Sequence, residues 1–125
     1  VTNSIHSYIA NAQNQTGNTG SAQAAFGTTG NDTIISGLAN EFFTGKGGSD
    51  TFVFSGNYGK DTITDFQASN DVLQLEHNIF ADFAAVMEHA TQVGSNVVIS
   101  ADPSHSITLE NNTIAQLNSN AFHLI

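Results

Sequence analysis

Apolar residues recur with a nine-residue period in the first half of the chain. Three blocks, 27–35, 36–44 and 45–53, follow one another without a gap, and a fourth, 56–64, comes after a two-residue insertion. The eighth place of each block is apolar, and the four residues there are Ile34, Phe43, Phe52 and Ile63. A short strand with one inward-pointing side chain is expected around each of these places. An internal repeat of this length predicts a fold that stacks equivalent units.

The polar places of the blocks repeat with the same period. The sixth place is always acidic, with Asp32, Glu41, Asp50 and Asp61 in turn, and glycines gather in the first four places. Two blocks make one turn of a flattened parallel coil, so blocks one and three should face each other, as should blocks two and four. The predicted fold is a mainly β short parallel β-roll, followed by a mixed α/β C-terminal cap.

This pattern predicts calcium sites between facing blocks. Carboxylate and carbonyl oxygens are the ligands that Ca²⁺ takes in proteins, and glycine lets the backbone carbonyls of a turn converge on one point. The first candidate set is Gly27, Thr29, Gly30 and Asp32 with Gly45, Gly47, Gly48 and Asp50; the second is Gly37, Ala39 and Glu41 with Gly56, Gly59 and Asp61. Block two departs from the pattern, since Ala39 replaces a glycine and Glu41 is longer than aspartate. The alternative is a metal-free series of Gly/Asp turns.

The four blocks, together with the segment 61–66 that reads Asp-Thr-Ile-Thr-Asp-Phe, resemble the C-terminal region of RTX proteins, which carry hemolysin-type calcium-binding nonapeptide repeats. These are bacterial exoproteins exported by type I secretion, and they include the serralysin-type proteases. The resemblance covers residues 26–125 and implies a secreted, extracellular module with a C-terminal export signal. It also implies the type I secretion machinery as a partner and adds Asp65 to the calcium residues. It does not indicate which enzyme or adhesin the module serves.

Composition narrows the possible partners. The 125 residues, enough for one domain, carry a net charge of −9 with two lysines and no arginine. Such a chain should repel nucleic acid and anionic membranes, whereas two bound Ca²⁺ would bring the charge from −9 to −5. The chain has no cysteine, so calcium would replace disulfides as a means of stabilisation. No apolar run approaches the roughly 20 residues of a membrane span, and no signal peptide is expected. Oligomeric state is not predicted.

The segments that flank the repeats predict further elements. Residues 1–25 are expected to be a linker or the tail of an upstream domain, with a short strand or helix over 5–10 and a solvated His6. After the roll, we expect a strand over 71–75 and a helix over 79–91 that Asn78 caps and Gly94 ends. Strands over 96–101 and 106–109, a helical turn over 113–117 and a last strand over 121–125 complete a cap over the open end of the roll.

No catalytic motif accompanies the repeats. The chain lacks His-Glu-x-x-His, Gly-x-Ser-x-Gly, a phosphate loop and a cysteine nucleophile, and the adjacent Glu88 and His89 are expected to be structural. We therefore expect a module that is not an enzyme. The competing interpretation is an extracellular recognition module for a polysaccharide or a partner, with calcium in a structural role. In that case Tyr58 and the phenylalanines would form a sugar-stacking platform.

Overall fold

The computed structural model describes residues 7–9 and 23–125. Each nine-residue block contributes one short strand, and these are β3 (Asp32–Ile35), β4 (Glu41–Thr44), β5 (Thr51–Phe54) and β6 (Lys60–Ile63). Strand β3 pairs in parallel with β5, and β4 pairs in parallel with β6. Alternate blocks therefore stack on each other, which confirms the predicted parallel β-roll.

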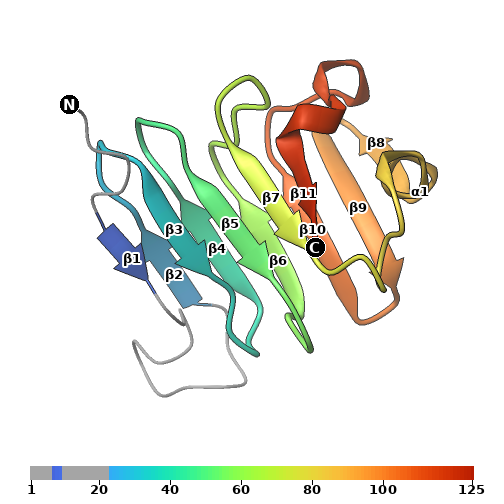
Figure 1. Ribbon diagram of the computed structural model, residues 1–125, viewed down its shortest axis with the longest axis horizontal. Helices are drawn as coiled ribbons and strands as arrows, with labels where there is room; N and C mark the ends of the chain where they lie inside the picture. The colour runs from blue at the N-terminus through green and yellow to red at the C-terminus, as the bar shows by residue number, and fades with distance from the viewer. Residues whose placement is uncertain (1–6, 10–22) are drawn as a thin grey trace.

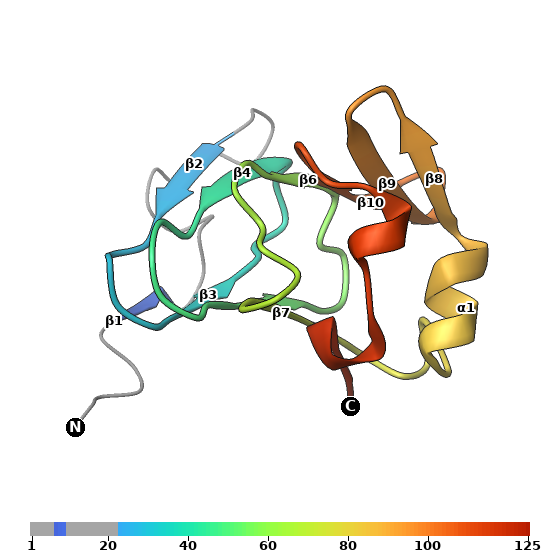
Figure 2. The ribbon, with the colours of Figure 1, turned by 90° about the horizontal axis from the view of Figure 1, so that it is seen from above.

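Two sheets face each other across the core, and their strands stack along the long axis of the molecule (Figure 1 and Figure 2). The first sheet has the order β1-β3-β5-β7-β11, and the second has the order β2-β4-β6-β10-β9-β8. The additional strands are β1 (Ser7–Ile9), β2 (Gln23–Phe26), β7 (Val72–Leu75), β8 (Ala90–Val93), β9 (Asn96–Asp102), β10 (His105–Leu109) and β11 (Phe122–Leu124). Pairing is parallel except in the β8-β9-β10 meander.

The N-terminal side of the roll differs from the linker expected over residues 1–25. Strand β1 lies inside the segment 5–10, for which a strand or helix is expected, and it pairs with β3. Strand β2 pairs with β4 and continues across the expected boundary between residues 25 and 26. These two strands add one rung that the nonapeptide pattern does not mark, because no acidic residue stands in either strand. His6 lies outside the described residues.

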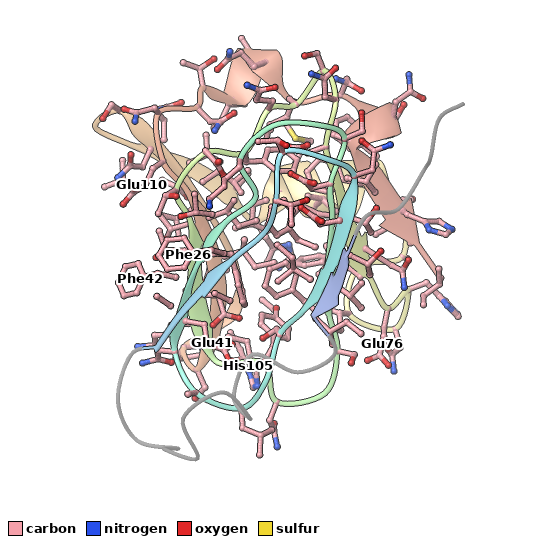
Figure 3. The ribbon with its side chains drawn as sticks, turned by 90° about the vertical axis from the view of Figure 1, so that its left-hand side faces the viewer. Phe26, Glu41, Phe42, Glu76, His105 and Glu110 are labelled. Carbon is pink, nitrogen blue, oxygen red and sulfur yellow. The ribbon has the colours of Figure 1, made fainter. Side chains whose placement is uncertain are left out.

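The core is a column of apolar side chains between the two sheets. The four eighth-place residues are at most 1% exposed, and the Phe43 and Phe54 rings meet edge to face with their centroids 5.9 Å apart. Tyr58 is also only 1% exposed, and its ring lies 5.5 Å from that of Phe54. A sugar-stacking platform that uses Tyr58 is therefore wrong. Phe26 and Phe42 are the exceptions, since both point away from the core on the outer face of their sheet (Figure 3).

The expected helix over 79–91 is shorter in the structure. Helix α1 spans Phe83–Glu88, and its N-cap is Asp82, whose side chain accepts a hydrogen bond from the Ala85 N–H. The residues after it form β8, which pairs antiparallel with β9. Gly94 does not end a helix. It has φ = +61° and occupies the two-residue turn between β8 and β9, where a hairpin requires a residue with positive φ.

The rest of the predicted cap is present, and it extends the sheets as well as covering their end. Strands β9 and β10 form the expected hairpin, residues Ile114–Gln116 form a 3-10 turn, and β11 is the last strand. Strand β10 continues the second sheet beside β6, and β11 continues the first sheet beside β7. The described residues include no helix of the length and apolar character that a membrane crossing needs.

Candidate metal centre

The roll has two edges, each made of the turns that lead from one sheet to the other. On the first edge lie the turns 27–31 and 45–49 and the connection 64–71, which lead into β3, β5 and β7. On the second edge lie the turns 36–40 and 55–59, which lead into β4 and β6. The predicted pairing of blocks therefore places one candidate set on each edge.

Three buried carboxylates stack on the first edge, and we call Asp32, Asp50 and Asp71 the Asp column. An oxygen of Asp50 accepts the Asp32 backbone N–H at 2.9 Å, and an oxygen of Asp71 accepts the Asp50 N–H at 2.9 Å. The three residues are at most 3% exposed. The carboxylates of Asp50 and Asp71 thus each join their own turn to the preceding one.

On the first edge, the first-place glycines are required because the sixth-place carboxylate folds back over them. A Cβ on Gly27 would overlap Oδ2 of Asp32, and a Cβ on Gly45 would overlap Oδ2 of Asp50. The Thr28 N–H donates to the same Asp32 oxygen at 2.6 Å. The Gly-x-x-x-x-Asp spacing therefore encodes a closed turn with the carboxylate at its centre.

The other predicted residues meet at equivalent places of alternate blocks. A Cβ on Gly47 would lie 3.4 Å from the Thr29 carbonyl oxygen, and a Cβ on Gly48 would overlap the Gly30 carbonyl oxygen. On the second edge, a Cβ on Gly59 would lie 3.1 Å from the Ala39 carbonyl oxygen, whereas Gly56 has φ = +59° and no such neighbour. Alternate turns therefore lie in direct backbone contact.

The second edge carries the buried Glu41–Asp61 pair. Both Glu41 oxygens accept the Gly37 N–H, and Asp61 accepts the Glu41 backbone N–H at 2.9 Å. The Ser36 hydroxyl lies 3.0 Å from Glu41 Oε1 and 2.8 Å from Asp61 Oδ2, so it bridges the two carboxyl groups. Ser36 stands in the first place, where the other blocks have glycine. The sequence analysis did not single out Ser36, although a serine in a place where the other blocks have glycine could have indicated it.

Burial makes the ionised form of these carboxyl groups costly. It raises the pKa of Asp50 to about 7, with further contributions from the charges of Asp71, Asp32 and Asp65. It raises the pKa of Asp61 to about 8, and the Glu41 charge adds to the effect. Burial also raises the pKa values of Glu41 and Asp71.

Asp65 and Asp71 complete the first edge rather than the second. The Asp65 carboxylate accepts the N–H groups of Gly45 and Lys46 at 2.9 and 2.7 Å, so it closes the turn of block three. Asp71 was missed as a site residue because the spacing changes. Asp32 and Asp50 are 18 residues apart, whereas Asp50 and Asp71 are 21 apart. The apolar Leu73, two residues after Asp71 as in each block, was the available signal.

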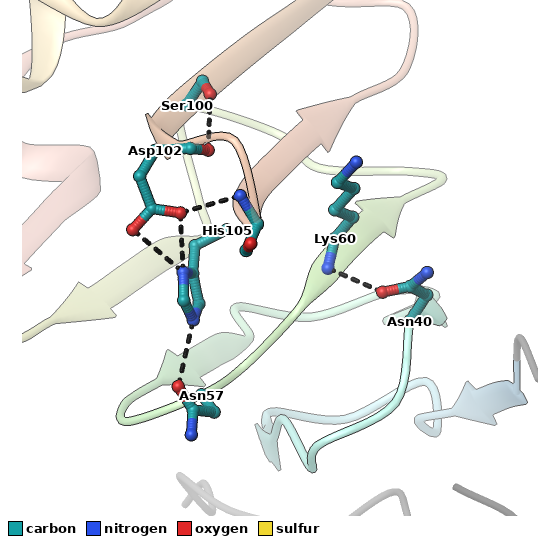
Figure 4. A network of polar contacts seen from close by, with 7 residues as sticks. Asn40, Asn57, Lys60, Ser100, Asp102 and His105 are labelled. Atoms are coloured by element: carbon teal, nitrogen blue, oxygen red, sulfur yellow. Dashed lines mark hydrogen bonds and ion pairs between the residues drawn. The ribbon is translucent and has the colours of Figure 1, made fainter. Parts of the chain in front are cut away.

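Fifth-place asparagines also hold alternate turns together. Asn31 Oδ1 accepts the Ser49 N–H at 2.7 Å, and Asn40 Oδ1 accepts the Lys60 N–H at 2.9 Å (Figure 4). Sequence reasoning missed both residues, although each precedes a sixth-place acid. They satisfy turn amides that would otherwise have no partner.

The histidines His89 and His105 of the cap form hydrogen bonds within the fold. His89 Nδ1 lies 2.9 Å from the Ala85 carbonyl oxygen, so the Glu88–His89 motif brings no second ligand. His105 lies between Asp102, at 2.8 Å, and Asn57, at 3.3 Å (Figure 4). Over residues 7–9 and 23–125, no group of three or more His, Asp or Glu side chains converges as a metal site. A cation on these edges would therefore need backbone carbonyls besides carboxylates.

The fold has a counterpart among solved structures. The extracellular lipase LipA from Serratia marcescens matches with a TM-score of 0.62 and 24% sequence identity over 86% of this chain. The matched region spans 20% of the length of that lipase. No protein-family model and no curated protein matches the sequence. The similarity shows that this chain has the mainly β, parallel-stranded roll fold.

Proposed function

We propose that this chain is a calcium-binding module whose folding depends on calcium, belonging to a bacterial protein exported by type I secretion. The observation that carries the proposal is the burial of acidic groups without cationic partners. Within the described part of the chain, no lysine or histidine pairs with Glu41, Asp50, Asp61 or Asp71. Leaving carboxylates buried and unpaired costs several kcal/mol each, so a cation or protons must compensate them.

The residues present fit a calcium ion. Asp50 Oδ2 is buried and accepts no hydrogen bond from the described residues, so it offers an unused oxygen. On the first edge, Asp32, Asp50, Asp65 and Asp71 would hold calcium together with carbonyls of their turns. On the second edge, Glu41 and Asp61 would do so. Calcium would supply the positive charge that permits these groups to stay ionised.

A melting experiment tests the calcium dependence. If each site has a Kd of about 10⁻⁴ M, then about 1–10 mM Ca²⁺ stabilises the fold by about 1.4–2.7 kcal/mol per site. We expect the melting temperature, followed by circular dichroism, to be clearly higher in millimolar Ca²⁺ than in EGTA. Millimolar Mg²⁺ serves as the control and should restore little of the difference. Identical melts in Ca²⁺ and EGTA would contradict the proposal.

We propose that the segment around β11 carries the export signal, as the resemblance of residues 26–125 to RTX exoproteins implies. The fold similarity to an extracellular lipase supports a secreted location. At the low calcium concentration of the cytosol, the carboxylates of each acidic edge would repel one another. The chain would then stay unfolded enough to pass through an exporter. Outside the cell, calcium would close the roll.

A fusion experiment tests the signal. The whole chain, which keeps the rung formed by β1 and β2, is fused behind a slow-folding reporter and expressed with a type I exporter. Deletion of residues 122–125 should leave the reporter in the cytosol. The matched control is Val93→Ala, which shortens one exposed apolar side chain outside the deleted segment. Equal reporter in the medium with and without the deletion would rule out this tail as a necessary signal.

We propose a non-catalytic role because, among the described residues, no catalytic constellation accompanies the acidic edges. The carboxyl groups accept hydrogen bonds from backbone amides of neighbouring turns, so their contacts hold the turns of the roll together. Any enzymatic activity would belong to a domain attached to this module.

A further inference from the structure

A cavity of about 560 Å³ lies between the connection 64–71 of the first edge and the C-terminal cap. One wall is the connection between β6 and β7, around residues 67–69, and the other is the segment 111–118, which contains a 3-10 turn. Asn118 joins the two walls, since its Nδ2 lies 3.4 Å from the Ala68 carbonyl oxygen. Figure 2 shows this connection and the 3-10 segment at the C-terminal half of the molecule. The volume is within the roughly 300–1,000 Å³ of small-molecule sites.

The lining of this cavity is unlike the rest of the surface. It contains five carboxamide side chains, those of Gln67, Asn111, Asn112, Gln116 and Asn118, and none of its lining residues is ionisable. The chain as a whole carries a net charge of −9. The lining offers no counter-charge to a charged ligand, so it favours a neutral one.

Asn112 provides a fixed hydrogen-bond acceptor in this lining. Its side chain is buried, with 2% of the residue exposed, and its Nδ2 donates to the carbonyls of Phe66 at 3.1 Å and Glu110 at 2.9 Å. A flipped amide would bring Oδ1 against these two carbonyl oxygens, so the two hydrogen bonds determine the orientation of the group. Its Oδ1 accepts no hydrogen bond from the residues that the structure describes. This oxygen is therefore available to accept a hydrogen bond from a ligand or from water.

Two glutamines provide donors at the same cavity. Gln116 Oε1 accepts the Thr113 N–H at 2.8 Å, and Gln67 Oε1 accepts the Asn70 side-chain amide at 3.0 Å. Both oxygens are therefore used, and both Nε2 groups remain without an acceptor in the described part of the chain. Together with Asn112, they present donors and an acceptor in one hollow.

We propose that this cavity binds a neutral mono- or disaccharide. Sugar hydroxyl groups both donate and accept hydrogen bonds, and carboxamides match them in both roles. Phe66 is only 4% exposed, so the cavity offers no open aromatic face to a flat apolar ligand. The contacts come from the cap and from the connection 64–71, in which the Gln67 N–H donates to the Asp71 carboxylate, so sugar binding has to be measured at constant Ca²⁺.

The test is an NMR titration of the ¹⁵N-labelled full chain at constant Ca²⁺ with cellobiose, lactose and N,N′-diacetylchitobiose. We expect saturable shifts of the backbone amides of 66–69 and 111–118 with at least one of these sugars. Digalacturonic acid, the charged control, should bind more weakly. Gln67→Ala should weaken binding about 2- to 10-fold, the value of one hydrogen bond. The matched control is Gln74→Ala on the outer face of β7, which should bind as the parent does.

Several results would overturn the proposal. These are the absence of shifts with all three neutral sugars at tens of millimolar, shifts confined to other surfaces, and equal binding by Gln67→Ala and the parent. Equal or tighter binding of digalacturonic acid would also overturn it. Melting curves of both variants establish that each is folded, so a loss of binding cannot be mistaken for unfolding.

Discussion

At the scale of single residues, the backbone space beside the acidic groups determines which positions tolerate a side chain. Gly45 lies under the Asp50 carboxylate and beside the Phe52 ring, whereas Gly47 lies at an ordinary contact distance from the Thr29 carbonyl. Both are glycines of the same block, yet only the first is enclosed. The repeat pattern alone does not separate them.

Gly45→Ala should lower the free energy of unfolding by about 1–3 kcal/mol, because the new Cβ overlaps Asp50 Oδ2 and lies 3.0 Å from Phe52 Cζ. Gly47→Ala is the matched control and should change the free energy of unfolding much less, since its nearest neighbour lies 3.4 Å away. Urea denaturation in EGTA measures both without the contribution of calcium. Equal losses would show that the carboxylate moves aside freely.

At the scale of elements, the chain between residues 79 and 93 shows how a neighbouring strand limits a helix. The apolar residues Phe80, Phe83, Met87 and Ala90 follow a helical period, which predicts a helix as far as residue 91. The structure ends α1 at Glu88 because Ala90–Val93 form a ladder with β9. Hydrogen bonding to an available sheet edge outweighs the modest helical preference of these residues.

Asp82→Ala should destabilise the protein by about 0.5–2 kcal/mol, because it removes the side-chain acceptor for the Ala85 N–H at the start of α1. Asp82→Asn keeps an acceptor oxygen and should retain most of that stability. Hydrogen exchange of the Ala85 amide gives a local readout beside the global melt. Similar exchange rates in both variants would mean that the cap contributes little to this helix.

At the scale of the whole molecule, stability and calcium binding are linked to pH. The raised pKa values of Asp50, about 7, and Asp61, about 8, mean that the metal-free fold binds protons more tightly than the unfolded chain. This stabilisation is complete below the ordinary pKa of 3.8 and is lost as the pH rises through about 7 and 8. Calcium competes with the same protons, so its stabilising effect should grow over that interval.

The melting temperature in EGTA should therefore fall as the pH rises from about 5 to about 8, whereas in Ca²⁺ it should fall much less. Asp50→Asn puts a neutral amide in place of the protonated acid. It should flatten the EGTA profile and reduce the response to calcium. Glu76→Gln, at a partly exposed acid outside the repeat blocks, is the matched control. An EGTA profile that rises with pH would contradict the linkage.

Features that depend on interactions within or between the nine-residue blocks could be predicted from the sequence. The nine-residue period predicted the strands β3 to β6, the stacking of alternate blocks and the burial of the apolar eighth places. It also placed Asp32 with Asp50 and Glu41 with Asp61. These features repeat because each block forms the same local turn and can bury its strand only against an equivalent one.

The tertiary structure decided what lies outside that period. It added β1 and β2 as a further rung, ended α1 early, and brought Asp71 and Asp65 to the first edge. The longer connection shifts Asp71 to 21 residues after Asp50, and nothing local specifies that the two acids stack. The sequence by itself therefore determined the repeating unit, because it is encoded within nine residues. Only packing against neighbouring strands decided the ends of the roll, because open sheet edges pair with whatever segment reaches them.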